Sequence, residues 1–317
     1  MSVVVPARNA EATLAGCLAS IARASGDLCV EVLVADNGSV DGTAAVAAAA
    51  GARVVSLPGM RVSALRSRAA ADTSGRILAF IDADHEIGAD WFRLAIQRLD
   101  ETGVGAAGAA YLAPSPGTWV QRLYDLLRRR PEGVHDAAWL PSGNLAVTRR
   151  VFEEVNGFDP RLESCEDVDF CRRVRARGYR LVSDSRLESV HHGDPATLRD
   201  LFRGELWRGR DTLMGLRPPV QVRDLPSTLY PVLTLGLIAA GLLLVPLGVL
   251  IGWWPLGAVG IMLAAIPLPR MAIIVRRGRL RPPRDWARAY ALSAVYELAR
   301  ALALVMRAGH EVRRGEG

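Results

Sequence analysis

The chain has 317 residues, a formal net charge of +6 and a hydrophobic content of 50%, which leaves room for one large domain or two smaller ones. It contains no lysine, so all 39 basic residues are arginine. This excludes catalysis through a lysine Schiff base and a phosphate-binding P-loop, which requires a lysine. Because the arginines lie near apolar segments rather than among exposed aromatic residues, we expect no nucleic-acid binding.

The part of the chain before residue 200 alternates between short apolar runs rich in β-branched residues and alanine-rich stretches. The runs predict strands at 2–6, 30–35, 52–57 and 76–81, and the stretches between them predict helices. This alternation is typical of an α/β domain with a mainly parallel sheet. No Gly-x-Gly-x-x-Gly motif follows the first strand, which argues against a dinucleotide-binding Rossmann domain.

Polar residues follow three of these strands, in PARNAE (6–11), ADNGSVDGT (35–43) and DAD (82–84). Ligands of open α/β sheets bind beyond the carboxyl ends of the strands, so we expect the three clusters to meet at one edge of the sheet. Asp36, in the second cluster, could hydrogen-bond a nucleobase.

Turn and cap formation is the simplest explanation of these polar residues. Asn37 and Gly38 could serve merely to turn the chain while Asp41 caps the next helix, and Asp82 and Asp84 could cap a helix that begins near Ala89. Metal binding is the alternative, because two carboxylates on a tight turn can hold Mg²⁺ or Mn²⁺ while substrate phosphate oxygens and water fill the remaining coordination sites.

A further acidic cluster occupies residues 163–169, at the start of an arginine-rich helix that ends at Gly178. Acidic side chains in the first turn of a helix are favoured by its dipole, so we expect part of this cluster, and Asp169 in particular, to cap the helix. The sequence VHHGD follows at 190–194, and two histidines near carboxylates favour a ligand role over a purely structural one.

The C-terminal part of the chain contains a long apolar segment, the 45 uncharged residues from Leu225 to Pro269. One continuous helix of this length would span about twice the ~30 Å hydrocarbon core of a membrane, so the segment must fold back. We predict a helical hairpin formed by Leu229–Ile251 and Leu256–Val275, with GWWPLG at 252–257 as its turn. A pair of buried core helices is the competing interpretation.

Basic residues flank this hairpin on both sides. The arginine-rich segment 276–284 should stay in the cytoplasm, and the tail 285–307 predicts an amphipathic helix, which we place at the membrane surface in preference to a third span. Both termini then lie in the cytoplasm. The segment 197–217 interleaves arginines with large apolar residues, so it could rest on anionic lipid or hold the phosphates of a lipid-linked acceptor.

The order of the motifs resembles that of family 2 glycosyltransferases with the GT-A fold. The series consists of VVVPARNAEATLAGCLASI, VLVADNGSVDGT, ILAFIDAD, GNLAVTRRVFEEVNGFD, EDVDFCRRVRARGYRL and VHH, and the resemblance covers roughly residues 2–215. Each motif is weak by itself, whereas the ordered series is highly specific. The resemblance implies an inverting transfer of a sugar from a nucleotide-diphosphate sugar, with Mg²⁺ or Mn²⁺ as the cofactor.

The resemblance also implies roles for individual residues. Asp167 matches the catalytic base, and Asp82, Asp84 and His191 match metal ligands. The residues expected to bind the donor are Pro6, Ala7, Arg8, Asn9, Glu11, Asp36, Asn37, Gly38, Arg66, Asp82, Ala83 and Asp84. The residues expected to contact the acceptor are Gly143, Asn144, Glu166, Arg203 and Arg208.

The sequence departs from the family pattern at several places. Ser67 and Ala69 stand where relatives often carry asparagine and glycine, and DADHE replaces the DADLQ of polyprenyl-phosphate sugar transferases. ELWRGRD at 205–211 does not match the Gln-x-x-Arg-Trp motif of processive synthases, so we expect a non-processive enzyme. The alternatives are a catalytically inactive GT-A scaffold of a polysaccharide assembly complex and a nucleotidyltransferase, which would usually carry a glycine-rich loop with lysine.

These features predict four segments: a GT-A domain (1–195), an amphipathic juxtamembrane segment (196–227), a transmembrane hairpin (228–276) and a basic loop with a final helix (277–317). We expect the protein at the inner cell membrane with its catalytic domain on the cytoplasmic face. Its partners would be the sugar donor and a lipid-linked saccharide acceptor of cell-envelope or exopolysaccharide synthesis.

Overall fold

The computed structural model describes the chain except residues 130, 211–224, 247–251 and 315–317. Parts of the predicted juxtamembrane segment and of the first predicted membrane helix therefore lie outside the described residues. The chain forms two compact units, one from Met1–Ser115 and Arg128–Asp194 and the other from Pro116–Leu127 and Pro195–Gly317. The predicted domains did not separate Pro116–Leu127 from the N-terminal part of the chain.

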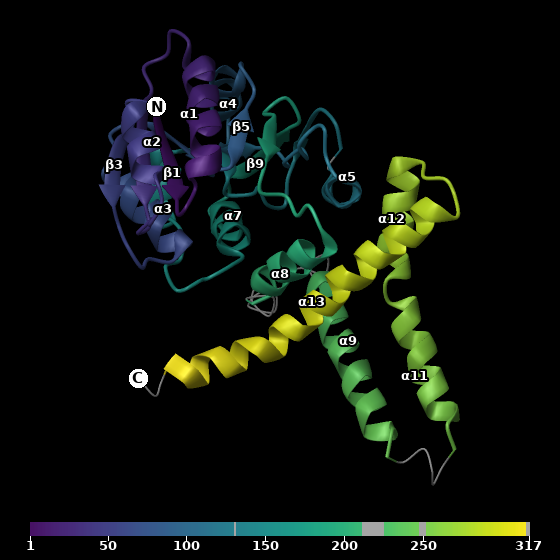
Figure 1. Ribbon diagram of the computed structural model, residues 1–317. Coiled ribbons are helices and arrows are strands. Elements are labelled where there is room, and N and C mark those ends of the chain that lie inside the picture. Colours follow the sequence, from purple (N-terminus) through teal and green to yellow (C-terminus); the bar gives the residue numbers. More distant parts are fainter. Residues whose placement is uncertain (130, 211–224, 247–251, 315–317) are drawn as a thin grey trace. The chain divides into compact units, whose positions relative to one another are not determined.

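An eight-stranded sheet forms the centre of the first unit, with the strand order β3-β2-β1-β4-β8-β6-β9-β7 (Figure 1). Its strands are β1 (Ser2–Ala7), β2 (Glu31–Asp36), β3 (Arg53–Ser56), β4 (Ile77–Ile81), β6 (Val104–Gly108), β7 (Val134–Asp136), β8 (Asn144–Thr148) and β9 (Arg180–Asp184). The first four strands are the predicted ones, and they pair in parallel. β8 is antiparallel to both β4 and β6, so the sheet is mixed but mainly parallel, as predicted.

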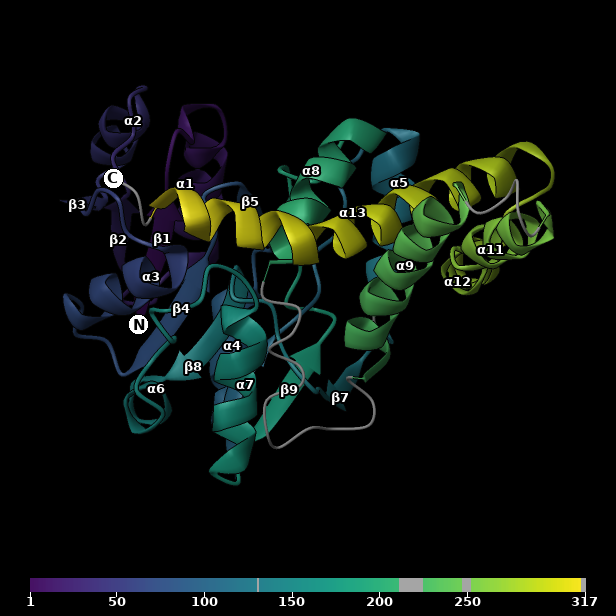
Figure 2. The same cartoon turned by 90° about the horizontal axis from the view of Figure 1, so that it is seen from below.

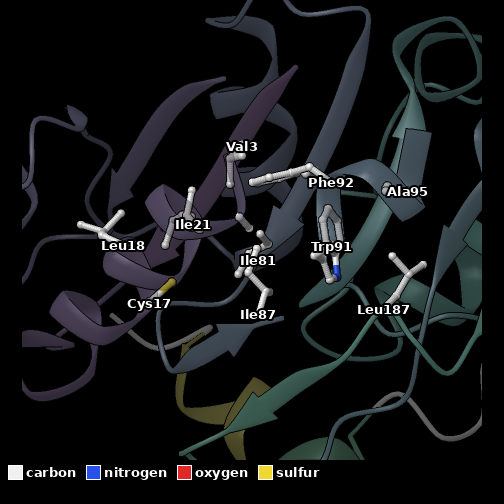
Figure 3. Close-up of a cluster of buried hydrophobic side chains, with 14 of the residues drawn as sticks. Val3, Cys17, Leu18, Ile21, Ile81, Ile87, Trp91, Phe92, Ala95 and Leu187 are labelled. Carbon is white, nitrogen blue, oxygen red and sulfur yellow. The ribbon is translucent and has the colours of Figure 1, made fainter. Parts of the chain in front are cut away.

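Helices cover both faces of this sheet because its strands carry apolar side chains on both faces, and these must be buried. The helices are α1 (Glu11–Ser25), α2 (Thr43–Ala49), α3 (Val62–Ala71), α4 (Trp91–Leu99), α6 (Arg149–Glu154) and α7 (Glu166–Ala176). Val3 and Val5 belong to one buried apolar cluster, whereas Val4 between them belongs to another. Figure 3 shows the first cluster, to which Val3 of β1, Ile21 of α1 and Phe92 of α4 belong.

A small antiparallel ribbon stands apart from the main sheet. It pairs β5 (His85–Ile87) with β10 (Ser189–His191), and the register places His85 directly opposite His191. The alternative in which Asp82 and Asp84 cap a helix near Ala89 is wrong, because β5 intervenes and α4 begins only at Trp91.

The second unit is helical. Its helices are α5 (Trp119–Arg128), α8 (Leu198–Arg208), α9 (Leu225–Leu244), α11 (Trp254–Ala265), α12 (Leu268–Gly278) and α13 (Arg284–Arg314). α9 packs against α11, and α13 packs against α8, α9 and α12. The second predicted hairpin helix is interrupted near Pro267, where α12 starts anew after α11 ends, because proline lacks the backbone N–H that would continue the helix.

Two helical segments, Trp254–Gly278 and Arg284–Met306, are long and apolar enough to cross a membrane by length and composition, and the apolar helix Leu229–Leu244 is shorter. Only 17% of an apolar 18-residue stretch within Trp254–Gly278 is buried within the protein. The side chains of Leu243 and Trp254 are 71% and 76% exposed. This exposure argues against a pair of buried core helices and weakly favours membrane association.

Candidate functional site

The carboxyl ends of β2, β1 and β4 bring the predicted polar clusters to one edge of the sheet. Asp36 ends β2 opposite Ala7, the last residue of β1, and Asp82 directly follows β4. Asp36 is only 7% exposed, and its Oδ1 accepts hydrogen bonds from the amide of Ser39 at 3.0 Å and from the Ser39 hydroxyl at 2.5 Å. The carboxylate is therefore fixed in position at the sheet edge.

Several predicted donor-binding residues hold the loops of this edge together. The Asn37 side chain donates to the carbonyl of Met60 at 2.8 Å and accepts from its amide at 3.0 Å. Asn9 Oδ1 accepts from the amide of Val40, and Glu11 Oε2 accepts from the amide of Gly42. These three side chains thus shape the loops, which agrees with turn and cap formation as the explanation of these residues.

The remaining predicted donor residues from these loops fall into three settings. Pro6 and Ala7 are buried inside β1, whereas Arg8 is exposed beyond its end. Gly38 adopts a left-handed backbone conformation with a φ of +72°, which glycine enters at no steric cost. Ala83 is buried between the two aspartates of the DAD sequence.

Arg66 of α3 connects the DAD turn with the start of α7. Its guanidinium contacts Asp82 Oδ1 at 2.5 Å and Glu166 Oε1 at 2.8 Å, and the Ser142 hydroxyl donates to the same Glu166 oxygen at 3.0 Å. The Arg66 side chain is 4% exposed. A buried arginine that bridges two carboxylates fixes both of them, and leaving either without its partner is costly.

Replacing Arg66 with alanine should therefore destabilise the protein strongly. Loss of one partner of a buried ion pair costs about 3 kcal/mol, which lowers the unfolding midpoint of a domain of this size by about 6–12 °C. Arg68→Ala is the matched control, because Arg68 lies in the same helix but its ion pair with Asp72 is exposed, and such pairs contribute about 1 kcal/mol or less. Differential scanning fluorimetry of both variants would contradict this account if their midpoints fell equally.

Asp84 faces two histidines of the β5–β10 ribbon. Its Oδ2 lies 3.2 Å from His191 Nε2, and its Oδ1 lies 3.9 Å from His85 Nε2. Ligand atoms of the three residues all lie within 4.8 Å of one another. His192 turns away and pairs with Glu86 at 3.1 Å. One carboxylate and two imidazoles at this spacing could hold a metal ion.

The charges of this group follow from its surroundings. Burial opposes ionisation of Asp84, but the hydrogen bond and charge of His191 lower its pKa to about 2. Burial lowers the pKa of His85 to about 4. Burial acts in the same direction on His191, but its contacts with Asp194 and Asp84 raise its pKa to about 9. A cation that binds here must displace the proton on His191.

The start of α7 carries the predicted base. Asp167 lies in the first turn, after Cys165 in a left-handed conformation with a φ of 57°. Burial and the neighbouring charge of Glu166 raise the pKa of the Asp167 carboxyl to about 7. A carboxylate with a pKa near neutrality is suited to accept a proton at physiological pH.

Asp169 lies in the first turn of α7, where the helix dipole favours an acidic side chain as predicted. Its carboxylate contacts Arg172 at 2.9 Å and Arg173 at 2.7 Å. These arginines lie on the same face, one helical turn further on. Asp169 therefore also forms ion pairs along α7.

Gly143 and Asn144 precede and begin β8, next to the DAD turn. A side chain on Gly143 would collide with the carboxylate of Asp82 and force that carboxylate to move. Asn144 is 0% exposed; it donates to the carbonyls of Ala109 and Leu187 and accepts from the indole of Trp91 at 2.7 Å. This burial argues against the predicted acceptor contact of Asn144, whose amide instead ties β8 to its surroundings.

The two predicted acceptor residues of α8 belong to the second unit. Arg208 donates to Glu205 Oε1 at 3.0 Å, and the Tyr124 hydroxyl donates to the same oxygen at 2.7 Å. Glu205 is 1% exposed, so Arg208 balances a buried charge. Arg203 is exposed on the other side of the helix.

Three residues of the site were not predicted from the sequence. His85 directly follows the DAD motif, and Asp194 lies three residues after His191, so their spacing was an available signal. Tyr111 had no such signal. The centroid of its ring lies 4.4 Å from the ring centroid of His85 and 5.2 Å from that of His191.

Comparison with known proteins gives consistent similarities. A family model described as glycosyl transferase family 2 matches residues 2–155. Glycosyltransferase AglE of Haloferax volcanii is 28% identical over 206 residues, which cover 62% of this chain and 67% of AglE. Glucosyl-3-phosphoglycerate synthase of Mycobacterium tuberculosis is 44% identical over 94 residues, which cover 26% of this chain and 28% of the synthase. The chain thus spans about two thirds of the first relative and less than a third of the second.

Solved structures show a similar fold. The mannosyltransferase PcManGT from Pyrobaculum calidifontis, in complex with GDP-Man and Mn²⁺, has a TM-score of 0.61 at 18% identity and covers 95% of this chain and 85% of its own. Glucosyl-3-phosphoglycerate synthase from Mycobacterium tuberculosis, in complex with Mn²⁺, UDP and phosphoglyceric acid, has a TM-score of 0.50 at 25% identity and covers 69% and 78%.

Proposed function

The N-terminal domain of this chain belongs to glycosyl transferase family 2, and from this membership we propose that the protein transfers a sugar from a nucleotide-diphosphate sugar to a saccharide acceptor with inversion. The domain has the GT-A fold of the solved relatives. The observation that carries the proposal is the convergence of Asp36, Asp82 and Asp84 at the carboxyl ends of β2 and β4, which is where α/β sheets bind nucleotides.

The donor would lie along this edge. Asp36 would accept a hydrogen bond from the nucleobase, and the diphosphate would lie beside Asp84 and His191. Mn²⁺ or Mg²⁺ bound there would neutralise the negative charge that builds on the departing diphosphate. Both solved relatives are complexes that contain Mn²⁺, which supports a divalent metal ion as the cofactor. One carboxylate oxygen of Asp82 would contact the ribose, while Arg66 holds the other one, Oδ1.

The acceptor hydroxyl would be activated by Asp167. The acceptor oxygen attacks the anomeric carbon, the bond from that carbon to the diphosphate oxygen breaks, and the hydroxyl proton passes to the Asp167 carboxylate. Glu166 cannot easily share this role, because its Oε1 already accepts from Arg66 and Ser142.

A panel of nucleotide sugars tests the proposed function. The full chain in detergent would be incubated with each donor, Mn²⁺ and a lipid extract, and the released nucleoside diphosphate would be measured. We expect one donor to be turned over, with inversion visible by NMR of the product. Turnover with retained configuration would refute inversion. If no donor is turned over, the proposed glycosyltransferase activity is refuted.

We further propose that the second unit attaches the protein to the inner membrane. α9 and the α11–α12 pair would form the spanning hairpin, while α13 lies at the surface. In both views α13 runs across α9 instead of alongside it, which supports a surface position (Figure 1, Figure 2). Charged residues on α13, among them the 3% exposed Glu297 that binds Arg270 at 2.8 Å, also disfavour a span.

Both termini should consequently face the cytoplasm, together with the catalytic domain. A protease-sensitive reporter at the C-terminus is expected to be cut in inverted membrane vesicles and protected in right-side-out vesicles. The opposite protection pattern would show that α13 crosses the membrane as a third span.

Membrane attachment suggests a lipid-linked saccharide as acceptor. Arg203 and Trp207 are exposed at neighbouring positions of one face of α8, and an arginine beside an aromatic residue suits a phosphate at a membrane surface. Arg203→Ala should raise the KM for the acceptor about tenfold or more and spare the KM for the donor. Arg208→Ala is expected instead to destabilise the second unit, because it removes the ion-pair partner of the buried Glu205.

The control for Arg203 is Arg23→Ala, which removes an exposed arginine from the last turn of α1. This variant should keep both KM values. If the enzyme glycosylates short water-soluble acceptors as efficiently as lipid-linked ones, Arg203 serves membrane attachment only.

A further inference from the structure

The geometry of the β5–β10 ribbon points to a metal site with two imidazole ligands. Building on the proposed function, we propose that His85 is a ligand together with Asp84 and His191, and that this ligand set makes the protein select Mn²⁺ over Mg²⁺. The family resemblance implied Asp82, Asp84 and His191 as the ligands and gave His85 no role.

His85 has a ring nitrogen that no described residue satisfies. The side chain is 0% exposed, and its Nε2 has no hydrogen-bond partner among the residues that the structure describes. Its Nδ1 lies 2.6 Å from the Ser189 hydroxyl. If Nδ1 donates this hydrogen bond, the tautomer inferred from it leaves a free electron pair on Nε2. A buried polar atom without a partner is costly, and a cation would use that electron pair.

The distances suit a common ion. Metal ligands at bond lengths of about 2.1 Å stand about 3.0 Å apart at right angles and about 4.2 Å apart when opposite. The two distances from the Asp84 carboxylate join different oxygens to the imidazoles, Oδ2 to His191 Nε2 at 3.2 Å and Oδ1 to His85 Nε2 at 3.9 Å, and both lie in this interval. The third pair of ligand atoms is no more than 4.8 Å apart, so a small contraction completes the site.

Both histidines are oriented in the way metal ligands usually are, because each binds an acceptor through its other ring nitrogen. His191 Nδ1 lies 2.6 Å from Asp194 Oδ1, and Asp194 is in turn paired with Arg128. The antiparallel register keeps His85 opposite His191. A side chain on Gly193 would collide with the Asp84 carboxylate and approach His191, so glycine lets the chain close over the site.

The ligand types determine the preference between metals. Mg²⁺ favours oxygen ligands in a strict octahedron, whereas imidazole nitrogen suits transition-metal ions better. Asp82, which would have added a second carboxylate, is held by Arg66 at 2.5 Å. The site therefore offers one carboxylate and two nitrogens, and Mn²⁺ should bind more tightly than Mg²⁺.

Pulsed EPR of the full chain in detergent, loaded with Mn²⁺ alone, tests this directly. The ¹⁴N modulation should show two coordinated histidine nitrogens in the wild-type protein and one in His85→Ala. The same substitution should weaken Mn²⁺ binding by about 10- to 100-fold and reduce the preference for Mn²⁺ over Mg²⁺ in competition titrations. His192→Ala is the matched control, because it removes the adjacent exposed histidine, and it should retain both nitrogens.

If His85→Ala does not fold, Ser189→Ala is the second variant, which should keep both nitrogens and lose Mn²⁺ affinity. One nitrogen or none in the wild-type protein would overturn the proposal, as would a count that His85→Ala leaves unchanged. A protein with two nitrogens that turns over no nucleotide sugar would refute the proposed function and leave this site standing. A protein that turns over a nucleotide sugar but shows a single coordinated histidine nitrogen would refute this metal site and leave the proposed function standing.

Discussion

Asp167→Asn is expected to lower kcat by about 10²- to 10⁴-fold, because general base catalysis contributes this much to a proton transfer. The substitution keeps the size of the side chain and removes only its capacity to accept a proton. The affinity for the donor, measured by calorimetry with the nucleoside diphosphate, should stay close to that of the wild-type protein. Glu163→Gln is the matched control, since Glu163 lies in the same acidic cluster and pairs with the partly exposed Arg61. An equal loss of donor affinity would assign Asp167 to donor binding.

The same residue predicts the pH dependence of the reaction. Burial and Glu166 raise the pKa of Asp167 to about 7, so the group is protonated and inactive as a base below this pH. The value of kcat/KM should therefore rise with pH, reach half of its maximum near pH 7 and level off above it. A profile that stays flat down to pH 5 would exclude Asp167 as the base.

Asp84→Ala should lower transfer by about 10²- to 10³-fold, because a bound cation contributes several kcal/mol to stabilising the departing diphosphate. Removing the metal from the wild-type enzyme with excess chelator should give a similar loss, and Mn²⁺ should restore activity only where Asp84 is present. Asp27→Ala, which breaks an exposed ion pair with Arg93, should behave like the wild-type protein. Full turnover in excess chelator would rule out a catalytic metal.

The sheet and its binding edge could be predicted because their signals are local. Four short β-branched runs separated by alanine-rich stretches predict parallel strands, and the structure has them at nearly the predicted positions. Parallel strands place their carboxyl ends together, so the convergence of Asp36 and Asp82 followed from the pattern alone.

The metal ligands were harder to predict because they depend on contacts between distant segments. β5 has only three residues, and it exists because it pairs with β10, about a hundred residues further along the chain. Sequence patterns of helices and strands extend over several residues, and a ribbon this short therefore gives no periodic signal. No role was therefore predicted for His85 from the sequence, and its position opposite His191 became visible only in the fold.

The division into two units was hidden for the same reason. α5 shows an ordinary amphipathic pattern, and nothing local indicates that Val120 and Leu123 pack with Leu201 and Leu292 of the helical unit. Similarly, Asn144 could be matched to a family position, but its complete burial beside Trp91 depends on tertiary packing.

A structure of the full chain with Mn²⁺ and the nucleoside diphosphate identified by the donor panel tests the central claim most directly. The account predicts the base beside Asp36, the diphosphate beside Asp84 and the ion between Asp84 and His191. A nucleotide bound away from the carboxyl ends of β2 and β4, or an ion bound without Asp84, would contradict it.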